Sequence, residues 1–315
     1  MGSKYYAAVD LGTNSCRLVI SDEKGNYVYK DTQPVRLGEG MYEKMRFTPE
    51  AMQRGYVALA DFQKHIQEYG CSRVRAIATA SCRMAANGSE FVRQVENLCG
   101  LKLEVIDGVE EARLNLRGAV MNSKGKAPYV VVYDLGGGST EITLATNDEA
   151  QNILYTISIP WGARNASEAF ALQDDYDIAE ADRLRAEVKR YTDKFKTESD
   201  YETLKDKCCA VATSSSPLRL SAWIHNRGEY VRENEDGQVL KAEDMNRVIA
   251  QMNAMSCKER EACVYIGKKR APIFIAAGVI FKTIYDELGL TELTASLRSA
   301  KDGIIEEFLT EEKNG

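Results

Sequence analysis

The chain has 315 residues, 44% of them hydrophobic and 28% charged, with a formal net charge of -6. This length exceeds what one hydrophobic core usually supports, so we expect two domains in a soluble globular protein. The negative charge excludes a general attraction to nucleic acid or to an anionic membrane. There is no apolar run of about 18 residues and no basic N-terminal segment followed by an apolar one, so we expect a cytoplasmic protein without nucleic-acid or membrane partners.

The cysteines form no CxxC pair, and His65 and His225 are the only histidines that could join them in a metal site. We therefore interpret the cysteines as reduced, mostly buried thiols rather than as a zinc site or a disulfide framework. The eight positions are Cys16, Cys71, Cys82, Cys99, Cys208, Cys209, Cys257 and Cys263.

The first part of the chain alternates between predicted strands and helices. Two strands flank a first glycine turn, and a third strand runs on to a turn with Gly38 and Gly40. Thr48 is the expected N-cap of a helix with Pro49 at its first position and with Gly70 at its end. The predicted strands are 5–10, 15–21, 25–37, 74–80 and 101–107, and the helices after the first are 89–100 and 108–120.

The segment NSKGKAP at 122–128 is the best linker candidate, and YVVVYDLGGGSTEITLAT directly after it restarts the strand, turn, strand pattern. A long amphipathic helix is predicted at 177–196, and a helix that is apolar on most sides at 273–288. We expect an α/β protein with domains at 1–125 and 126–315, with the option that a C-terminal helix at 299–312 packs back on the first domain.

Two glycine stretches align as an internal repeat of the form D-L-G-x-x-S, at 10–15 and 134–139. A tight turn after a strand presents several backbone N–H groups, and glycine lets an oxyanion approach them, which is typical of a phosphate cradle. A carboxylate before such a turn repels phosphate unless a divalent cation lies between them. An ordinary hairpin turn explains one copy, whereas two copies in separate halves favour a function. A P-loop is excluded because no GK[ST] follows.

Several motifs resemble those of the exopolyphosphatase and guanosine pentaphosphate phosphohydrolase (Ppx/GppA) family of the actin-like ATPase superfamily. They are DLGTNSCRLVI, RLGEGM, ATASCR, EVIDGVEEARL and YDLGGGSTEI, and the match is specific over 5–145 and weaker afterward. The resemblance implies two ribonuclease H-like domains with an interdomain cleft. It also implies Mg²⁺ or Mn²⁺ as cofactor, and hydrolysis of the terminal phosphoanhydride bond of polyphosphate or guanosine pentaphosphate.

The resemblance also implies site residues. Glu111 is the candidate for orienting and deprotonating the attacking water, with the adjacent Glu110 as its competitor, and Arg83 is the arginine that meets phosphate oxygens. Without the family context, both glutamates are equally explained as solvated residues at a helix start. Asp134 and Glu141 complete the catalytic set, Asp10 and Asp134 are the metal candidates, and Asn14, Ser15, Gly136, Gly137, Gly138, Ser139 and Thr140 are expected to line the phosphate path.

The second half departs from the family pattern. VATSSSPLRL at 211–220 contains no glycine where a third glycine-rich loop is expected, so we expect close backbone approach to phosphate to be lost there. Arg270, Ala271 and Pro272 stand where Arg-Ala-Asp is usual. These changes leave the preference for chain length or nucleotide open. The negative protein must meet a polyanion through local cations, for which Lys268, Lys269, Arg270 and Arg164 are the candidates beyond Arg83, although a solvated surface cluster explains the lysines equally well.

Two other classes of protein remain open. A kinase or ATPase of the same superfamily is disfavoured by the EEARL and ATASCR motifs, and a non-catalytic sensor that binds alarmone or polyphosphate is suggested by the altered third loop. Phosphate release separates them, because a hydrolase releases phosphate from polyphosphate without an acceptor, a kinase requires ATP and an acceptor, and a sensor only binds. A homodimer is possible.

Overall fold

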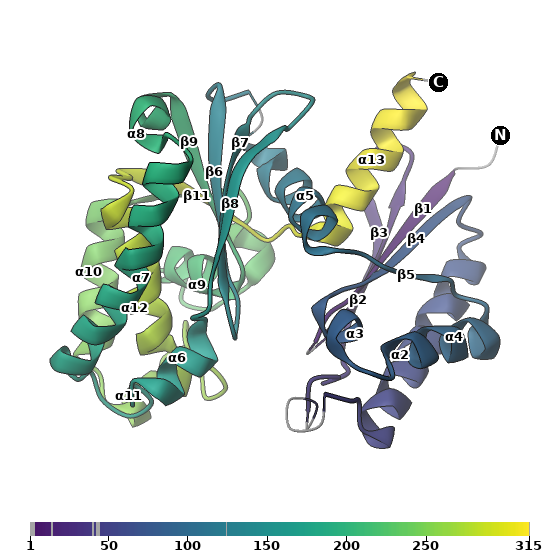
Figure 1. The fold of residues 1–315 in the computed structure, drawn as a ribbon, viewed down its shortest axis with the longest axis horizontal. Coiled ribbons are helices and arrows are strands. Elements are labelled where there is room, and N and C mark those ends of the chain that lie inside the picture. The colour runs from purple at the N-terminus through teal and green to yellow at the C-terminus, as the bar shows by residue number, and fades with distance from the viewer. Residues whose placement is uncertain (1–3, 14, 40, 42–44, 124, 315) are drawn as a thin grey trace. The chain divides into compact units, whose positions relative to one another are not determined.

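The computed structural model describes residues 4–314 except 14, 40, 42–44 and 124, and it contains two compact units (Figure 1). The first unit comprises Met1–Gly118 and Ser299–Gly315, and the second comprises Ala119–Arg298. Each unit has its own sheet and its own hydrophobic core.

The unit boundaries differ from the expected domains, 1–125 and 126–315. The chain after Gly118 belongs to the second unit, because the side-chain amide of Asn147 donates to the carbonyls of Ser123 and Ala127, at 2.9 and 3.1 Å. The last helix, α13 (Ala300–Asn314), belongs to the first unit, as in the predicted option of a helix at 299–312 that packs back on the first domain. It packs closely on α5 (Gly108–Ala119), since a Cβ at Gly303 would lie 2.1 Å from the carbonyl oxygen of Leu114.

The sheet of the first unit has the strand order β3-β2-β1-β4-β5. Strand β1 pairs antiparallel with β2 and parallel with β4, and β5 continues the parallel direction. The strands are β1 (Tyr5–Leu11), β2 (Ser15–Asp22), β3 (Tyr27–Pro34), β4 (Arg73–Ala78) and β5 (Leu103–Val105).

Strand β1 is buried on both faces, which explains its nearly continuous apolar sequence. Ala7, Val9 and Leu11 point to one core, and Tyr6 and Ala8 point to the other. Apolar residues of α2 (Pro49–Glu68) and α4 (Gly88–Cys99) fill the first core, and residues of α13 fill the second. Helix α2 begins as predicted, with the Thr48 hydroxyl accepting a hydrogen bond from the Ala51 N–H.

The sheet of the second unit has the order β10-β11-β9-β6-β7-β8. Counted from β8, the first five strands repeat the order of the first unit, with β6 in the place of β1, and β10 adds one edge strand. The repeat seen in the glycine stretches therefore extends to strand order and direction. The strands are β6 (Tyr129–Leu135), β7 (Thr140–Thr146), β8 (Ile153–Ile159), β9 (Cys208–Thr213), β10 (Val239–Lys241) and β11 (Glu292–Ser296).

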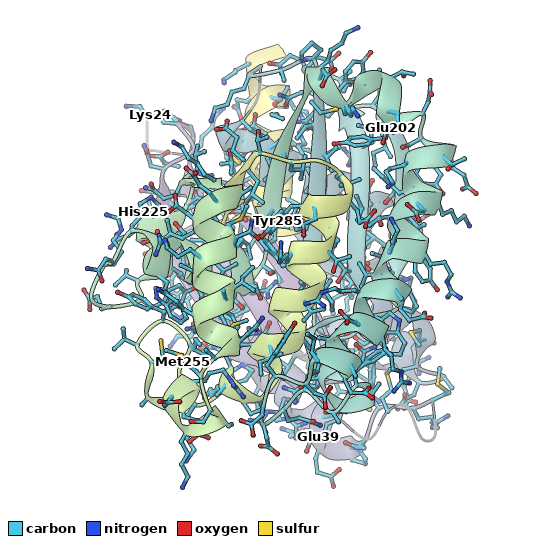
Figure 2. The ribbon with its side chains drawn as sticks, turned by 90° about the vertical axis from the view of Figure 1, so that its left-hand side faces the viewer. Lys24, Glu39, Glu202, His225, Met255 and Tyr285 are labelled. Carbon is cyan, nitrogen blue, oxygen red and sulfur yellow. The ribbon has the colours of Figure 1, made fainter. Side chains whose placement is uncertain are left out.

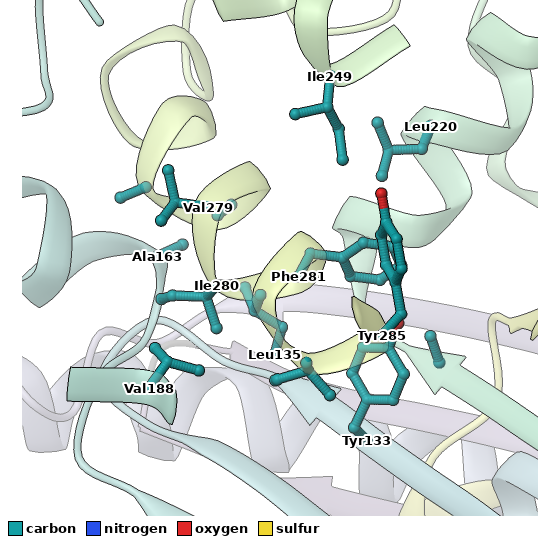
Figure 3. Close-up of a cluster of buried hydrophobic side chains, with 14 of the residues drawn as sticks. Tyr133, Leu135, Ala163, Val188, Leu220, Ile249, Val279, Ile280, Phe281 and Tyr285 are labelled. Atoms are coloured by element: carbon teal, nitrogen blue, oxygen red, sulfur yellow. The ribbon is translucent and has the colours of Figure 1, made fainter. Parts of the chain in front are cut away.

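Helix α12 (Ala271–Glu287) forms the centre of the core of the second unit, as its apolar sequence predicts. Val279, Ile280 and Phe281 pack near the side chains of β6, and the rings of Phe281 and Tyr133 are 5.2 Å apart (Figure 3). The other helices of this unit are α6 (Ala163–Ala169), α7 (Ile178–Glu198), α8 (Tyr201–Leu204), α9 (Ser215–Ile224), α10 (Ala242–Asn253) and α11 (Cys257–Ala262).

Polar and apolar side chains separate as in other globular folds. Lys24, Glu39 and Glu202 are exposed at the outside of the ribbon, whereas Tyr285 is buried among the helices of the second unit (Figure 2). All eight cysteines are free thiols, as predicted, but Cys16 and Cys82 alone among them are buried and the other six are half-buried, so the expectation of mostly buried thiols is wrong. Among the described helices, none is both long enough and apolar enough to span a membrane.

Candidate active site

The candidate residues of the first unit gather at one edge of its sheet. Strands β1, β4 and β5 run parallel, so their C-terminal ends meet at the same edge. The first glycine turn follows β1, the short helix α3 (Ala80–Met84) with Arg83 follows β4, and helix α5 with Glu111 follows β5. Residues that are far apart in the sequence are thus brought together by strand direction alone.

The first glycine turn is closed by a hydrogen bond from the Gly12 N–H to the Ser15 carbonyl, at 3.1 Å. A second bond, from the Gly38 N–H to the Thr13 carbonyl, ties the RLGEGM segment to this turn. Ser15 is half-buried, and Asn14, a predicted phosphate ligand, lies outside the described residues.

The second glycine turn has the same closing bond, from the Gly136 N–H to the Ser139 carbonyl, at 2.9 Å. Gly137 and Gly138 are exposed, and a Cβ on either would meet no atom within 4 Å. In the part of the chain that the structure describes, their N–H groups donate to no acceptor. Backbone amides in such a turn suit an anion, as the sequence predicts.

The carbonyls of the second turn face helix α6. The Gly136 carbonyl accepts from Ala163 at 2.9 Å, and the Gly137 carbonyl accepts from Arg164 at 2.8 Å. Gly162 makes this contact possible, because a Cβ there would lie 2.6 Å from the backbone carbon of Gly137. With its carbonyls engaged on one side, the turn leaves its N–H groups for a ligand on the other.

Thr140 does not fit the predicted phosphate path. It is fully buried, and its hydroxyl donates to the carbonyl of Trp161 at 2.8 Å. The first residue of β7 points into the core, whereas Ser139, one residue earlier, is half-buried in the turn. We therefore assign Thr140 to holding the turn against Trp161 and not to binding phosphate.

The two acidic strand ends differ in what stands opposite them. Asp10 on β1 is directly opposite Arg17 on β2, and the Arg17 guanidinium donates to the Asp10 carboxylate at 3.2 Å. At the equivalent position of the second unit, Asp134 on β6 is directly opposite Glu141 on β7. Like charges directly opposite each other on a sheet destabilise it, so the second pair is the better place for a cation.

Arg83 and Glu111 form an ion pair. Arg83 Nη1 donates to Glu111 Oε2 at 3.0 Å and to the carbonyl oxygen of Ile106 at 2.6 Å. Both side chains are less than one third exposed, at 30% and 28%. Two predicted site residues from different helices are therefore in contact, and both remain reachable from solvent.

Glu110 is held in a different network. Arg113 donates two hydrogen bonds to its carboxylate, at 2.7 and 2.8 Å, and Arg75 donates a third at 2.8 Å. Hydrogen bonds from Arg113 and Arg75 lower the pKa of Glu110 to about 2. A carboxylate stabilised as an anion by two arginines is a poor base, so the structure favours Glu111 over Glu110 as the catalytic candidate.

Thr79 has a structural role. Its N–H and its hydroxyl both donate to the carbonyl of Leu11, at 3.2 and 3.4 Å, and the residue is 6% exposed. Thr79 thereby fixes the start of α3 against the end of β1. The Thr79 carbonyl in turn accepts from the Arg83 N–H at 3.3 Å, so this contact fixes the backbone that carries Arg83.

The third loop keeps a glycine-like backbone without a glycine. Ser214 has φ of 98° and ψ of -172°, a region that glycine occupies almost alone. Its hydroxyl accepts from the Ser216 N–H at 3.4 Å, at the N-terminus of α9. Ser214 thus has the backbone conformation of a glycine but carries a side chain, so the expected loss of close backbone approach stays a prediction.

A group of cations surrounds the start of α12 in the second unit. Burial lowers the pKa of Arg270, and the nearby charges of Arg219 and Arg164 lower it further. The Arg219 guanidinium lies over the ring of Tyr230, 4.0 Å from its centroid. Lys268 and Lys269 are exposed. Sequence reasoning named Arg164 and Arg270 but missed Arg219 and Tyr230, which no short motif marks.

The described residues contain no group of three His, Cys, Asp or Glu side chains that could hold a metal ion. Mg²⁺ does not require such a group, because it usually takes one or two carboxylates and completes its shell with water and phosphate oxygens. Asp134 and Glu141 provide two carboxylates at one register position of the second unit. Asp10 fits less well, because Arg17 already neutralises it. Arg17 was not predicted, although its place opposite Asp10 follows from the hairpin register.

Two units of one strand order, each with a glycine turn after an acidic strand end, define a duplicated α/β fold, and turns of this kind suit an anion such as phosphate. Residues 18–312 match the Ppx/GppA phosphatase family, and the chain belongs to that family. Exopolyphosphatase 2 of Mycobacterium tuberculosis is 31% identical to this chain, over 95% of this chain and 96% of its own length.

Solved structures agree with this assignment. The crystal structure of the Aquifex aeolicus Ppx/GppA family member has a TM-score of 0.86 and 25% identity, over 98% of this chain and 99% of that one. An exopolyphosphatase-like protein has a TM-score of 0.81 and 26% identity, over the same shares. The predicted Ppx/GppA family is confirmed, and so is the predicted α/β fold with two domains, each built on its own sheet.

Proposed function

We propose that the protein hydrolyses the terminal phosphoanhydride bond of inorganic polyphosphate, or of guanosine pentaphosphate, by attack of water. The observation that carries this proposal is the contact between Arg83 and Glu111 at 3.0 Å in a protein of the Ppx/GppA phosphatase family. Phosphoanhydride hydrolysis needs mainly a positioned water and neutralised phosphate charge. A carboxylate and a guanidinium side by side supply both.

In the proposed reaction, Glu111 accepts a proton from the water whose oxygen forms the new bond to the terminal phosphorus. The bond between that phosphorus and the bridging oxygen breaks, and the bridging oxygen leaves with the shortened chain. Arg83 uses Nη1 to hold Glu111 and the Ile106 carbonyl, so the rest of its guanidinium is left for the phosphate oxygens.

Each unit has its own glycine turn, with Ser15 in the first and with Gly136, Gly137, Gly138 and Ser139 in the second, and each turn offers backbone N–H groups and hydroxyls to phosphate oxygens. A divalent cation, Mg²⁺ or Mn²⁺, would be held by Asp134, with Glu141 directly opposite it. When bound, this cation supplies neutralisation of the charge on the phosphate oxygens. Asp10, paired with Arg17, orients the first turn.

The sensor alternative loses part of its motivation. It was suggested by the missing glycines of the third loop, and Ser214 retains the backbone conformation that a glycine would have. The kinase or ATPase alternative has no support beyond the fold that it would share with this chain.

A turnover assay tests the proposal directly. Phosphate release is measured with Mg²⁺ on long polyphosphate, tripolyphosphate and guanosine pentaphosphate, and on ATP with and without an acceptor. We expect release from at least one of the first three substrates without an acceptor, and none from the matched Glu111→Gln protein. Binding without release from any of them would favour the sensor, and release that depends on an acceptor would favour the kinase.

A further inference from the structure

The cations at the start of α12 differ from most other arginines of the chain. Arg183 and Arg247 are typical, each bonded to a carboxylate of its own helix, at 2.8 and 2.9 Å. Within the described ranges of the second unit, five neighbouring positions have no carboxylate within ion-pair distance. They are Arg164, Arg219, Lys268, Lys269 and Arg270.

Arg219 is the member of this group whose guanidinium is bound to the protein. It extends from α9, and its Nη1 donates to the carbonyls of Tyr265 and Ile266, at 2.7 and 3.0 Å. Its guanidinium lies over the ring of Tyr230 at 4.0 Å. One side chain thereby joins helix α9, the loop that carries Tyr230 and the turn before α12.

The turn itself depends on these contacts. Tyr265 is held from its other side, because its ring stacks on Trp223 at 5.6 Å and its hydroxyl accepts from the Gly228 N–H at 3.1 Å. Gly267 follows with φ of 73°, and its carbonyl accepts from the Arg270 N–H at 3.0 Å. The position of Arg270 thus follows from the position of the carbonyls that Arg219 holds.

Keeping Arg219 and Arg270 close together without a carboxylate within ion-pair distance is unfavourable, and burial adds to this cost. The pKa of each guanidinium is lowered by burial. Such an arrangement is stabilised when an anion binds, and a polyanion with repeated phosphate groups meets several cations at once.

We propose that Arg219 is a positioning residue for the binding of polyphosphate, because it holds the turn 265–270 so that Arg270 and the lysines before it meet the phosphate chain. This inference rests on the proposed function for the identity of the polyanion. Arg219 acts through the backbone of the turn and not by touching the substrate. A lysine cannot replace it, because an ammonium has no planar face to lie on the ring of Tyr230 while it donates to the two carbonyls.

The test compares Arg219→Lys and Arg219→Met with a matched control, Arg247→Lys, in the full-length protein. Binding of long polyphosphate is measured by titration calorimetry, and kcat and KM are measured on long polyphosphate and on tripolyphosphate. We expect both Arg219 variants to raise Kd and KM for long polyphosphate about tenfold, equivalent to about 1.4 kcal/mol, with kcat unchanged. The control should bind like the unmodified protein.

A second pair of variants keeps every charge. Tyr230→Leu removes the aromatic face under Arg219 and should weaken the binding of long polyphosphate, as the Arg219 variants do. Tyr230→Phe keeps the ring and should bind long polyphosphate like the unmodified protein. Unchanged Kd in Arg219→Lys would overturn the proposal, because charge alone would then suffice. A lower unfolding midpoint with unchanged affinity would overturn it as well, since Arg219 would then be merely structural.

The measurements of polyphosphate binding test this inference separately from the proposed function. If the unmodified protein releases no phosphate but binds polyphosphate, and Arg219→Lys weakens that binding, the hydrolase proposal fails and the role of Arg219 stands. If turnover occurs and neither Arg219 variant changes Kd or KM, the hydrolase proposal stands and the role of Arg219 fails.

Discussion

Two adjacent glutamates on one helix are given different roles by their neighbours. Consecutive side chains on a helix point about 100° apart, so Glu110 and Glu111 cannot face the same partners. Glu111 contacts Arg83, which is itself bound to a backbone carbonyl, and Glu110 contacts Arg75 and Arg113. Changing each glutamate alone to glutamine therefore separates chemistry from stability.

For Glu111→Gln we expect kcat to fall by at least about a hundredfold, because general-base catalysis typically contributes 10²- to 10⁴-fold. The unfolding midpoint and the affinity for polyphosphate should change little, since glutamine keeps the shape of the side chain. Steady-state phosphate release and thermal unfolding of the same preparation measure both. A folded variant with a near-normal rate would contradict the assignment of Glu111.

For Glu110→Gln we expect the reverse, a loss of stability of about 1 to 3 kcal/mol at pH 7 with little change in kcat, because the amide lacks the charge that pairs with two arginines and turns an NH2 group toward their donors. The pKa of Glu110 is about 2 in the folded protein and has an ordinary value of 4.5. Its contribution is thus fully present above pH 4.5 and is lost as the pH falls toward 2.

Urea unfolding of the Glu110→Gln and unmodified proteins at pH 7 and pH 3 checks the Glu110 prediction. The difference between the two proteins should be smaller at pH 3. An equal difference at both values, or a loss of kcat as large as that of Glu111→Gln, would contradict it.

At the scale of elements, the connection between β9 and α9 stores strain. A non-glycine residue in the region occupied by Ser214 costs about 1 to 3 kcal/mol, whereas losing a serine N-cap in favour of glycine costs only a few tenths. The 3.4 Å distance from the Ser216 N–H to the Ser214 hydroxyl indicates a weak cap. Relief of the backbone strain at this position therefore outweighs the loss of the cap.

We expect Ser214→Gly to stabilise the protein by about 1 kcal/mol. The matched control is Ser256→Gly, because Ser256 caps α11 with φ of -64° in a capping box and should lose stability on the same change. Chemical unfolding of both variants measures the free energies. If both changes were destabilising, the backbone of Ser214 would not be strained.

The whole molecule carries a net charge of -6 and must bind a polyanion through local cations. Charge reversal in Lys268→Glu/Lys269→Glu should raise KM for long polyphosphate severalfold more than for tripolyphosphate, because only the longer chain reaches both lysines. The effect should shrink as salt rises, since exposed charges more than about 8 Å apart are screened at physiological ionic strength.

A matched control has the same change in net charge, with Lys24→Glu/Lys102→Glu in the first unit, where both lysines are exposed. Initial rates at several salt concentrations provide the comparison. Equal effects of the two double variants would mean that net charge alone matters, and the lysines before α12 would then be ordinary surface.

A metal requirement is the other property of the whole molecule. Activity should vanish with a chelator and return with Mg²⁺ or Mn²⁺, because Asp134 stands opposite Glu141 with the same charge. Asp134→Ala should raise the metal concentration needed for half-maximal rate more than Asp10→Ala, whose partner is Arg17. Hydrolysis in excess chelator would contradict the metal proposal.

Much of the fold was predictable because its signals are local. The two D-L-G-x-x-S turns join strands that are neighbours in the sequence, and each hairpin forms with the same closing bond. Helix α2 shows its cap and α12 its apolar surface in single stretches of sequence. Periodicity and turn residues suffice to predict such elements, because the apolar residues that a helix or strand buries recur at the period of that element within one stretch of sequence.

The partners of each site residue were decided by the tertiary structure. Arg83 lies 28 residues from Glu111, and Arg219 lies 46 residues from Tyr265, so no local pattern joins either pair. Parallel strand ends bring the first pair to one sheet edge, and packing against Tyr230 directs Arg219 to its two carbonyls. The angle between consecutive side chains on α5 places Glu111, and not Glu110, in contact with Arg83. The sequence by itself determined which residue types were present for phosphate chemistry, and strand direction, register and packing decided which of them meet.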